Sequence, residues 1–148
     1  MASLELTATP SPDDLALIGN ELTAFNHADV GLADRRALAV LIRDEDSVVI
    51  GGLSGYTAWG WLFTQLLFVP ESQRGKGVAG RLLATAEQEA AERGCHGAWI
   101  DTFSQDALLA YLKQGYEIFG ALPEFPKGRT RTFLRKALSG QPSPFGGE

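Results

Sequence analysis

The sequence predicts one α/β domain that contains a mixed sheet of six to seven strands with helices on both faces. Three observations support this prediction. Three apolar segments with short connections precede residue 70, a helix-forming segment follows a glycine-rich loop, and a strand, a short helix and two strands complete the chain. Short connections favour an antiparallel meander. A crossover helix then lets the next strand pair in parallel with the last strand of that meander.

The N-terminal part is expected to contain a short strand and a helix. Residues 4–8 alternate apolar and polar side chains, which favours a strand. Ser11 can cap a helix whose first position is Pro12. The apolar residues that recur at helical spacing are Leu15, Ile18, Leu22 and Phe25. The run at 26–29 breaks this pattern.

The remaining elements are predicted from apolar runs and from the glycines and prolines between them. Strands are expected at 37–43, 48–56, 61–69, 97–103, 116–120 and 130–136, and helices at 78–93 and 104–114. Pro70 ends the strand at 61–69 because it cannot donate to a ladder, and Gly94 suits a helix C-terminus. Residues 1–138 form the predicted domain. The glycine-, proline- and serine-rich residues 139–148 form a predicted flexible tail.

The composition argues against several classes of protein. The formal net charge of -5 disfavours nucleic acid and anionic membranes as partners. No apolar run approaches the roughly 20 residues of a membrane span, and the N-terminus has no secretory signal pattern. The single cysteine, Cys95, is typical of a reducing compartment, so we expect a cytoplasmic protein. With two histidines and one cysteine, no metal site is expected.

The segment from Arg74 to Gly80 has the composition of a phosphate-binding loop. Gly75, Gly77 and Gly80 leave the backbone bare where a helix begins. The first N–H groups of a helix have no partner within it, and the helix dipole adds positive charge there. The cationic side chains around the loop are Arg74, Lys76 and Arg81. Such a site suits a phosphate or a diphosphate.

Two other phosphate-binding motifs were weighed for this loop. A Walker-type loop needs four residues between its glycines and then Lys-Ser/Thr, which this chain lacks. The spacing Gly75-x-Gly77-x-x-Gly80 matches the dinucleotide fingerprint, and Asp101 follows at about the distance of its ribose-binding acid. However, a polar loop separates this fingerprint from the preceding strand, and the chain after Asp101 is too short for a second mononucleotide-binding half. NADH binding would support this alternative.

The pattern Arg74-x-x-Gly77-x-Ala79, between a strand and an Ala/Leu-rich helix, resembles the GNAT family of N-acetyltransferases. The family often carries a second run, Asn-x-x-Ala-x-x-(Leu/Phe)-Tyr-x-Lys-x-Gly-Phe, and residues 104–116 are similar to it. The corresponding residues here are Ser104, Ala107, Tyr111, Lys113, Gly115 and Tyr116. Both motifs occur in the family's order, and the resemblance covers about residues 3–138.

The resemblance implies that the loop binds the diphosphate of coenzyme A through backbone N–H groups, with the pantetheine arm beside the preceding strand. The implied cofactor-binding residues are Leu67, Phe68, Val69, Arg74, Gly75, Lys76, Gly77, Val78, Ala79, Gly80 and Ser104. Tyr111 matches the residue that often protonates the departing thiolate, so it is the implied catalytic acid. Ser104 stands where Asn is usual and is expected mainly to cap its helix.

The acceptor is implied to enter opposite coenzyme A, between the first helix and the late hairpin loop. The candidate substrate-binding residues are Asn26, His27, Tyr56, Trp59, Trp61 and Glu124. The general base is not identified. The strand at 61–69 has no carboxylate, and its Gln65 cannot take a proton at neutral pH. Asp101, Glu117, Glu124 and a water chain to a backbone carbonyl all remain open.

We therefore expect an N-acetyltransferase that transfers an acetyl group from acetyl-CoA to the primary amine of a small molecule by direct attack in a ternary complex. Two alternatives remain: acetylation of a protein or peptide amine, and an acyl-CoA-binding module without turnover. Many relatives are dimers, so a homodimer stays open as well. The sequence does not specify the acceptor or the acyl chain length.

Overall fold

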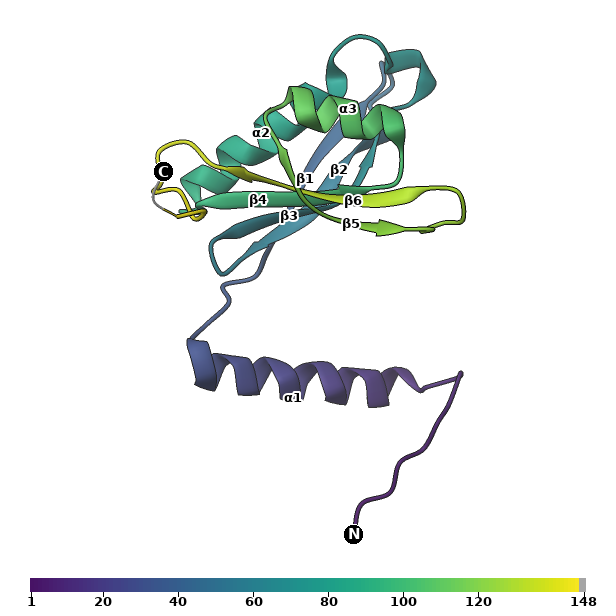
Figure 1. The fold of residues 1–148 in the computed structure, drawn as a ribbon, viewed down its shortest axis with the longest axis vertical. Coiled ribbons are helices and arrows are strands. Elements are labelled where there is room, and N and C mark those ends of the chain that lie inside the picture. The colour runs from purple at the N-terminus through teal and green to yellow at the C-terminus, as the bar shows by residue number, and fades with distance from the viewer. Residues whose placement is uncertain (147–148) are drawn as a thin grey trace. The chain divides into compact units, whose positions relative to one another are not determined.

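The computed structural model describes residues 1–146 and divides into two compact units, residues 1–33 and the chain from Asp34 onward (Figure 1). Each unit is described by itself. No helix of the described residues combines the length and the apolar character that a membrane span requires.

The N-terminal unit consists of an extended segment and helix α1 (Pro12–Val30). The Ser11 hydroxyl accepts the Asp14 N–H at 3.1 Å, which confirms the predicted cap. The polar run at 26–29 does not end the helix, because a break in apolar spacing leaves the backbone hydrogen bonds intact. The helix ends at Gly31, whose φ of +93° suits glycine. Its apolar face is exposed, since α1 has no buried residue.

The predicted strand at residues 4–8 does not form in the structure. Alternation of apolar and polar side chains predicts which face a strand would bury. It does not supply the hydrogen-bonded neighbour that a strand requires, and no ladder of the sheet includes these residues.

The second unit contains one six-stranded sheet in the order β1-β2-β3-β4-β6-β5. The strands are β1 (Arg36–Arg43), β2 (Val49–Ala58), β3 (Trp61–Phe68), β4 (Gly97–Thr102), β5 (Glu117–Pro123) and β6 (Thr130–Ala137). The helices are the 3₁₀ turn η1 (Glu71–Gln73), α2 (Val78–Glu92) and α3 (Gln105–Lys113). Strands β3 and β4 are parallel, and every other neighbouring pair is antiparallel. The mixed sheet and its antiparallel meander are therefore confirmed.

Helices α2 and α3 lie on the same face of this sheet (Figure 1). The core forms between them and the strands, and its largest fully buried side chains are Leu53, Leu62, Leu83, Ile100 and Leu134. Because side chains alternate along a strand, Leu62 faces the helices while Phe63 points to the opposite face.

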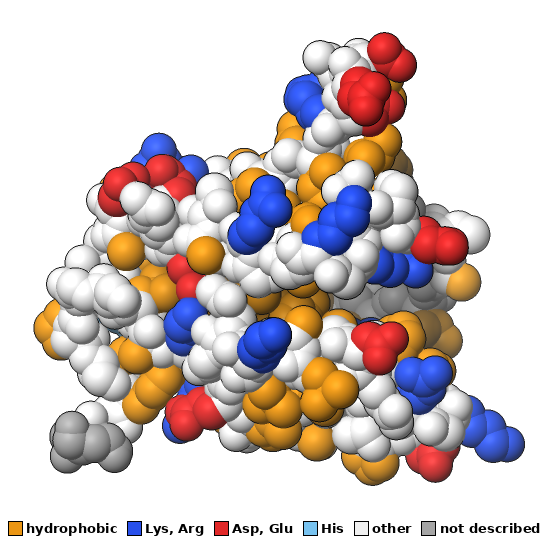
Figure 2. Space-filling view, turned by 90° about the horizontal axis from the view of Figure 1, so that it is seen from above, with side chains coloured by type: hydrophobic (Ala, Val, Ile, Leu, Met, Phe, Trp, Pro, Cys, Tyr) orange, Lys and Arg blue, Asp and Glu red, His pale blue; other side chains and the backbone are white. Residues whose placement is uncertain are grey.

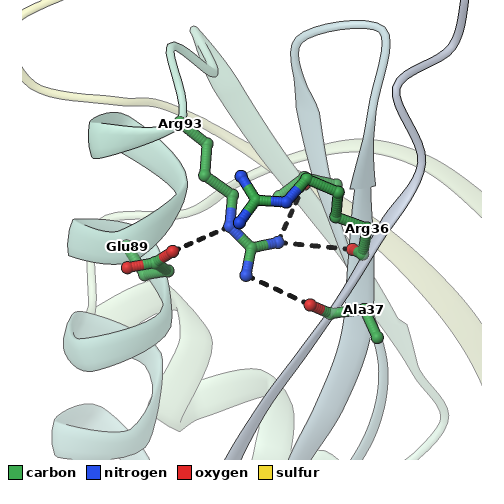
Figure 3. A network of polar contacts seen from close by, with 5 residues as sticks. Arg36, Ala37, Glu89 and Arg93 are labelled. Atoms are coloured by element: carbon green, nitrogen blue, oxygen red, sulfur yellow. Dashed lines mark hydrogen bonds and ion pairs between the residues drawn. The ribbon is translucent and has the colours of Figure 1, made fainter.

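The end of α2 is tied to the first strand by Arg93, whose side chain is 13% exposed. Its guanidinium donates to the carbonyls of Arg36 at 3.3 Å and Ala37 at 3.1 Å, and to the Thr57 hydroxyl at 3.1 Å (Figure 3). It also pairs with Glu89 one turn earlier at 2.8 Å. Since β1 is an edge strand, this one side chain fixes α2 over the outer part of the sheet.

The C-terminal segment has contacts of its own. The Phe145 ring lies 5.9 Å from the Trp61 ring, and the Arg135 guanidinium lies 4.2 Å from the Phe145 ring centre. The flexibility of the segment at 139–148 and the domain boundary at 138 stay predictions, and residues 147–148 lie outside the described residues.

We predict that Arg93→Met lowers the free energy of unfolding by about 2 kcal/mol, because hydrogen bonds to a charged group are lost and partly buried acceptors are left unpaired. Urea denaturation measures the change. Arg36→Met is the matched control, since Arg36 contributes only its carbonyl to this network. It should change stability by less than about 0.5 kcal/mol. Equal effects for the two variants would contradict the assigned role of Arg93.

Candidate functional site

Strands β3 and β4 pair over only part of their length. Their ladder runs from Trp61↔Gly97 to Thr64↔Ile100, although β3 continues to Phe68. The β2–β3 ladder is interrupted at the same place, because Gly55 pairs with Thr64 while Ser54 pairs with Leu66. Gln65 is therefore an extra residue in β3, and such a bulge bends a strand. Beyond Thr64 the two parallel strands diverge, and their facing backbone groups can bind an extended ligand that lies between them.

The diverging end of β3 leads into the glycine-rich loop. Gly75 and Gly77 have φ values of +75° and +71°, which L-residues rarely adopt, and Gly77 is the N-cap of α2. A Cβ at either position would meet nothing within 4 Å, so these glycines are required by backbone conformation rather than by space. The Arg74 Nε donates to the Val69 carbonyl at 2.9 Å and so holds the loop against the end of β3.

The N-terminus of α2 presents the predicted bare N–H groups. The Arg81 N–H donates to the Gly77 carbonyl at 3.2 Å and so begins the helical hydrogen-bond pattern. The N–H groups of Val78, Ala79 and Gly80 precede this bond and have no acceptor within the helix. They and the positive end of the helix dipole favour an anion here.

A pocket of about 660 Å³ lies between this helix start and α3. Its lining residues are Val69, Gln73, Arg74, Gly75, Gly77, Val78, Ala79, Gly80, Arg81, Ala84, Ala110, Lys113 and Gln114. Figure 2 looks onto the helix-covered side, where Lys and Arg side chains are spaced around exposed hydrophobic groups. The structure thus brings together most of the predicted loop residues around one cavity.

Helix α3 forms the wall of this pocket that sequence reasoning missed. Ala110, Lys113 and Gln114 contribute to it. A Cβ at Gly80 would lie 3.1 Å from the Gln114 amide oxygen, so α2 and α3 approach closely here. No local sequence signal gives the separation of two helices, although the spacing of Ala110 and Gln114 marks one face of α3.

The other predicted cofactor-binding residues do not line this pocket. Leu67 and Phe68 are on β3 beyond the point of divergence. Lys76 lines a second pocket of about 390 Å³ on the β1 side of α2. Ser104 caps α3, because its hydroxyl accepts the Ala107 N–H at 3.2 Å, and it lines a separate pocket at the start of β6.

A buried polar network fixes α3 against α2 and β6. Glu87 is 8% exposed. Its carboxylate accepts hydrogen bonds from the Tyr116 hydroxyl at 2.8 Å and from the Lys136 ammonium at 2.7 Å. Lys136 also donates to the Gln114 carbonyl at 2.8 Å, at the end of α3. Burial, followed by the charge and hydrogen bond of Glu87, raises the pKa of Tyr116, so its phenol stays protonated and donates to the carboxylate.

Tyr111 is buried on α3, and its ring centre lies 6.4 Å from that of Tyr116. Burial and then the negative charge of Asp101 raise the pKa of Tyr111 to about 12. At neutral pH the phenol is therefore protonated, so it can donate a proton but cannot accept one. Because Asp101 lies one residue beyond the last β3–β4 pair, the two groups border the diverging end of the strands.

Asp101 forms an ion pair with Arg131 on β6. The Arg131 guanidinium lies 5.3 Å from the centre of the Phe103 ring and 4.3 Å from that of Phe125. Arg131 was missed at the sequence level, because only the strand order β4-β6 places it beside Asp101. Phe125 belongs to the β5–β6 loop, where Glu124 accepts the Gly128 N–H at 2.8 Å and shapes the turn.

Two of the predicted substrate-binding residues lie near each other on β2 and β3, because Tyr56 pairs with Phe63 and Ala58 pairs with Trp61. Tyr56 lies in an aromatic row on the sheet face opposite the helices, 5.6 Å from Phe63, which stacks on Trp99 at 3.9 Å. Trp59 and Trp61 lie at the start of β3, and seven residues of strand, roughly 23 Å, separate Trp61 from Phe68.

The two other acceptor candidates, Asn26 and His27, lie on α1 in the N-terminal unit. Among residues 1–146, no three His, Cys, Asp or Glu side chains are grouped so that they could hold a metal ion. Cys95 is buried, and this burial raises the pKa of its thiol, which opposes nucleophilic use.

A glycine-rich loop at a helix N-terminus, beside two diverging parallel strands, defines an anion-binding α/β domain. The acetyltransferase (GNAT) family profile matches residues 8–116. The acetyltransferase Atu2258 of Agrobacterium fabrum is 50% identical over 119 residues, which cover 80% of this chain and 87% of that protein. The chain therefore belongs to the GNAT family and is an acetyltransferase, as the resemblance implied.

Two further relatives agree with this assignment. A crystal structure from Agrobacterium tumefaciens, assigned to the acetyltransferases, superimposes with a TM-score of 0.89 at 44% identity and covers 93% of this chain and all of that one. The blasticidin-S acetyltransferase of Streptomyces morookaense is 38% identical over 95 residues, 64% of this chain and 70% of that protein.

Removal of the Lys136 ammonium tests the network that forms the pocket wall. Lys136→Met leaves the buried Glu87 carboxylate without a counter-ion and with only the Tyr116 hydroxyl as donor, so we expect a loss of about 3 kcal/mol in the free energy of unfolding. Arg135→Met is the matched control on the same strand. The Arg135–Glu117 ion pair is more exposed, and its loss should cost less than about 1 kcal/mol. Denaturant titration of both variants measures the difference, and comparable losses would contradict this account.

Proposed function

We propose that this acetyltransferase uses acetyl-CoA and transfers the acetyl group to the primary amine of a small molecule in a ternary complex. The observation that carries the proposal is the divergence of β3 and β4 after Thr64 and Ile100, directly beside the bare N–H groups of α2. A long thioester substrate with a diphosphate at one end fits these two features together. A free phosphate or a nucleotide alone would need only the loop.

The residues present fit coenzyme A. The N–H groups of Val78, Ala79 and Gly80 suit its diphosphate. Leu67 and Phe68, beyond the point of divergence, offer backbone groups to the pantetheine amides. The Thr64 hydroxyl at this point is buried and has no hydrogen-bond partner in the described part of the chain. Because unpaired buried hydroxyls are costly, Thr64 supports the presence of a polar substrate group here. Acetyl-CoA would supply the acyl thioester.

Tyr111 suits the role of the acid that protonates the leaving thiolate. Its phenol is buried, protonated at neutral pH and adjacent to the end of the β3–β4 ladder through Asp101. A backbone N–H of β3 beyond Thr64 can polarise the thioester carbonyl while negative charge develops on its oxygen. In this proposal a β3 N–H stabilises the charge on the thioester oxygen, and Tyr111 donates a proton to the thiolate.

A small-molecule acceptor is supported by the Streptomyces morookaense relative, which is named for blasticidin S. The aromatic row at Tyr56 and Phe63 and the Phe125 ring offer apolar surfaces on the sheet face opposite the helices. Of the predicted acceptor-binding residues, Tyr56 belongs to this row, Trp61 lies two residues before Phe63 on the same strand, and Glu124 is next to Phe125.

Acetyl-CoA binding is tested by blocking the pocket. Gly80→Leu places a side chain between α2 and α3, where an added Cβ meets only the flexible end of Gln114. We expect its Kd for acetyl-CoA, measured by calorimetry, to rise at least about 10-fold, because the added side chain occupies the pocket. Gly19→Leu on α1 is the control, since a Cβ there meets nothing within 4 Å. Wild-type protein without measurable affinity for acetyl-CoA would overturn the proposed function.

Turnover is measured by the release of free CoA thiol with blasticidin S, benzylamine, an aliphatic diamine and a lysine-containing peptide as acceptors. Tyr111→Phe should lower kcat by about 100-fold, the usual scale for removing a general acid, while the Kd for acetyl-CoA changes less than twofold. The reverse pattern, with weakened binding and unchanged kcat, would show that Tyr111 is a packing residue. Exclusive use of the peptide would overturn the small-molecule assignment.

A further inference from the structure

The proposed reaction needs a group that receives the proton of the acceptor ammonium, and β3 has no carboxylate. Three carboxylates were open at the sequence level, and the structure distinguishes them. The Glu124 carboxylate is used by the Gly128 N–H inside its own turn. Glu117 is on β5, 57% exposed and paired with Arg135. Asp101 is 18% exposed on β4 and directly follows the β3–β4 ladder.

The position of Asp101 relates it to both reactants. Its neighbour Ile100 is the last residue of β4 that pairs with β3 and points into the core under the helices. Asp101 therefore points to the opposite sheet face, from which an acceptor can approach while the thioester lies between the strands. On its other side, Asp101 pairs in register with Phe133 of β6, which holds the backbone at this position.

We propose that Asp101 binds the acceptor ammonium and accepts its proton, and that Arg131 is the positioning residue of this carboxylate. The inference rests on the proposed function and adds to it the missing base.

Arg131 fixes the carboxylate and leaves part of it available. Its Nη1 contacts only Oδ1 of Asp101, and Oδ2 has no donor among residues 1–146. The Phe103 and Phe125 rings lie against the guanidinium, so Arg131 has few alternative positions. An ammonium that binds Oδ2 would lie beside these rings. The site therefore suits an amine attached to an apolar or aromatic group.

The step balances as follows. The acceptor ammonium transfers one proton to the Asp101 carboxylate and becomes a neutral amine. The nitrogen lone pair forms the C–N bond at the acetyl carbon, the C–S bond breaks, and the electron pair leaves on the CoA sulfur. Tyr111 then donates its phenolic proton to that thiolate. Formation of the amide releases a second proton from the nitrogen. Of this proton and the one held by Asp101, one restores the Tyr111 phenol and the other passes to solvent.

The arrangement also couples the base to the acid. The Asp101 charge contributes to the raised pKa of Tyr111. When Asp101 has taken a proton, this contribution disappears and the phenol becomes a stronger acid at the stage at which the thiolate leaves. The charged or titratable groups placed around Asp101 are Arg131 on β6, Tyr111 on α3 and Arg129, whose guanidinium donates to the Phe103 carbonyl at 3.2 Å.

The test compares Asp101→Asn with Glu117→Gln, which neutralises the carboxylate of the other ion pair with a β6 arginine. The acceptor is blasticidin S or benzylamine, whichever the wild type acetylates faster. We expect Asp101→Asn to lower kcat/KM for the acceptor about 100-fold and to leave the Kd for acetyl-CoA within twofold. Glu117→Gln should keep kcat/KM within twofold. For Asp101→Asn, log(kcat/KM) should rise with pH up to the pKa of the amine, because only the free base then reacts.

A second measurement needs no acceptor. Titration of tyrosine labelled with ¹³C at Cζ follows the Tyr111 phenol, whose pKa of about 12 should fall in Asp101→Asn because the neighbouring negative charge is gone, and stay in Glu117→Gln. Arg131→Lys, which keeps the charge but not the fork, should lower kcat/KM by about 10-fold with a wild-type pH profile.

Each outcome decides the inference. If wild type turns over and Asp101→Asn keeps its kcat/KM and its pH profile, Asp101 is not the base, although the proposed function stands. A Tyr111 titration that does not move would overturn the coupling between the proposed base and the proposed acid. If Asp101→Asn loses acetyl-CoA affinity along with activity, its role is structural. A wild type that neither binds nor consumes acetyl-CoA overturns the proposed function together with this inference.

Discussion

The divergence of β3 and β4 after Thr64 and Ile100 is the constraint on which the rest of the site depends. Parallel strands normally satisfy each other's backbone groups. Here an extra residue at Gln65 bends β3 away, which leaves the facing edges of both strands free. The same bend directs the end of β3 into the loop whose glycines begin α2. One backbone irregularity thus aligns a surface for an extended arm with a site for an anion.

Buried polar contacts hold helices α2 and α3 in place beside this opening. Lys136, Glu87 and Tyr116 connect β6, α2 and the segment after α3 through buried charge-assisted hydrogen bonds. A buried charge that loses its partner is costly, so such a network resists displacement of either helix. Arg93 does the same at the far end of α2 (Figure 3). The pocket between α2 and α3 is therefore bounded by elements that cannot separate without breaking ion pairs.

Charge is distributed unequally between the two sides of the sheet at the diverging strands. Tyr111 is buried on the helix side and stays protonated, whereas Asp101 points to the opposite face and carries its charge beside Arg131. The proposed acid and the proposed base lie on opposite sides of the same opening, which suits a reaction in which one proton leaves the acceptor and another reaches the departing group. The chain belongs to the GNAT family, and blasticidin-S acetyltransferase is among its relatives.

The sequence by itself determined the elements and the loop. Apolar spacing, caps and glycines are local signals, and they predicted the strands from β1 to β6, helices α2 and α3 and the glycine-rich loop between β3 and α2. The resemblance of two motifs indicated the family. The local signals failed where the outcome depends on partners distant in the chain. Residues 4–8 form no ladder, and Arg131 was missed. Only the tertiary structure placed β6 beside β4 and α3 beside α2, because strand order and helix separation follow from packing of the whole core rather than from any local pattern.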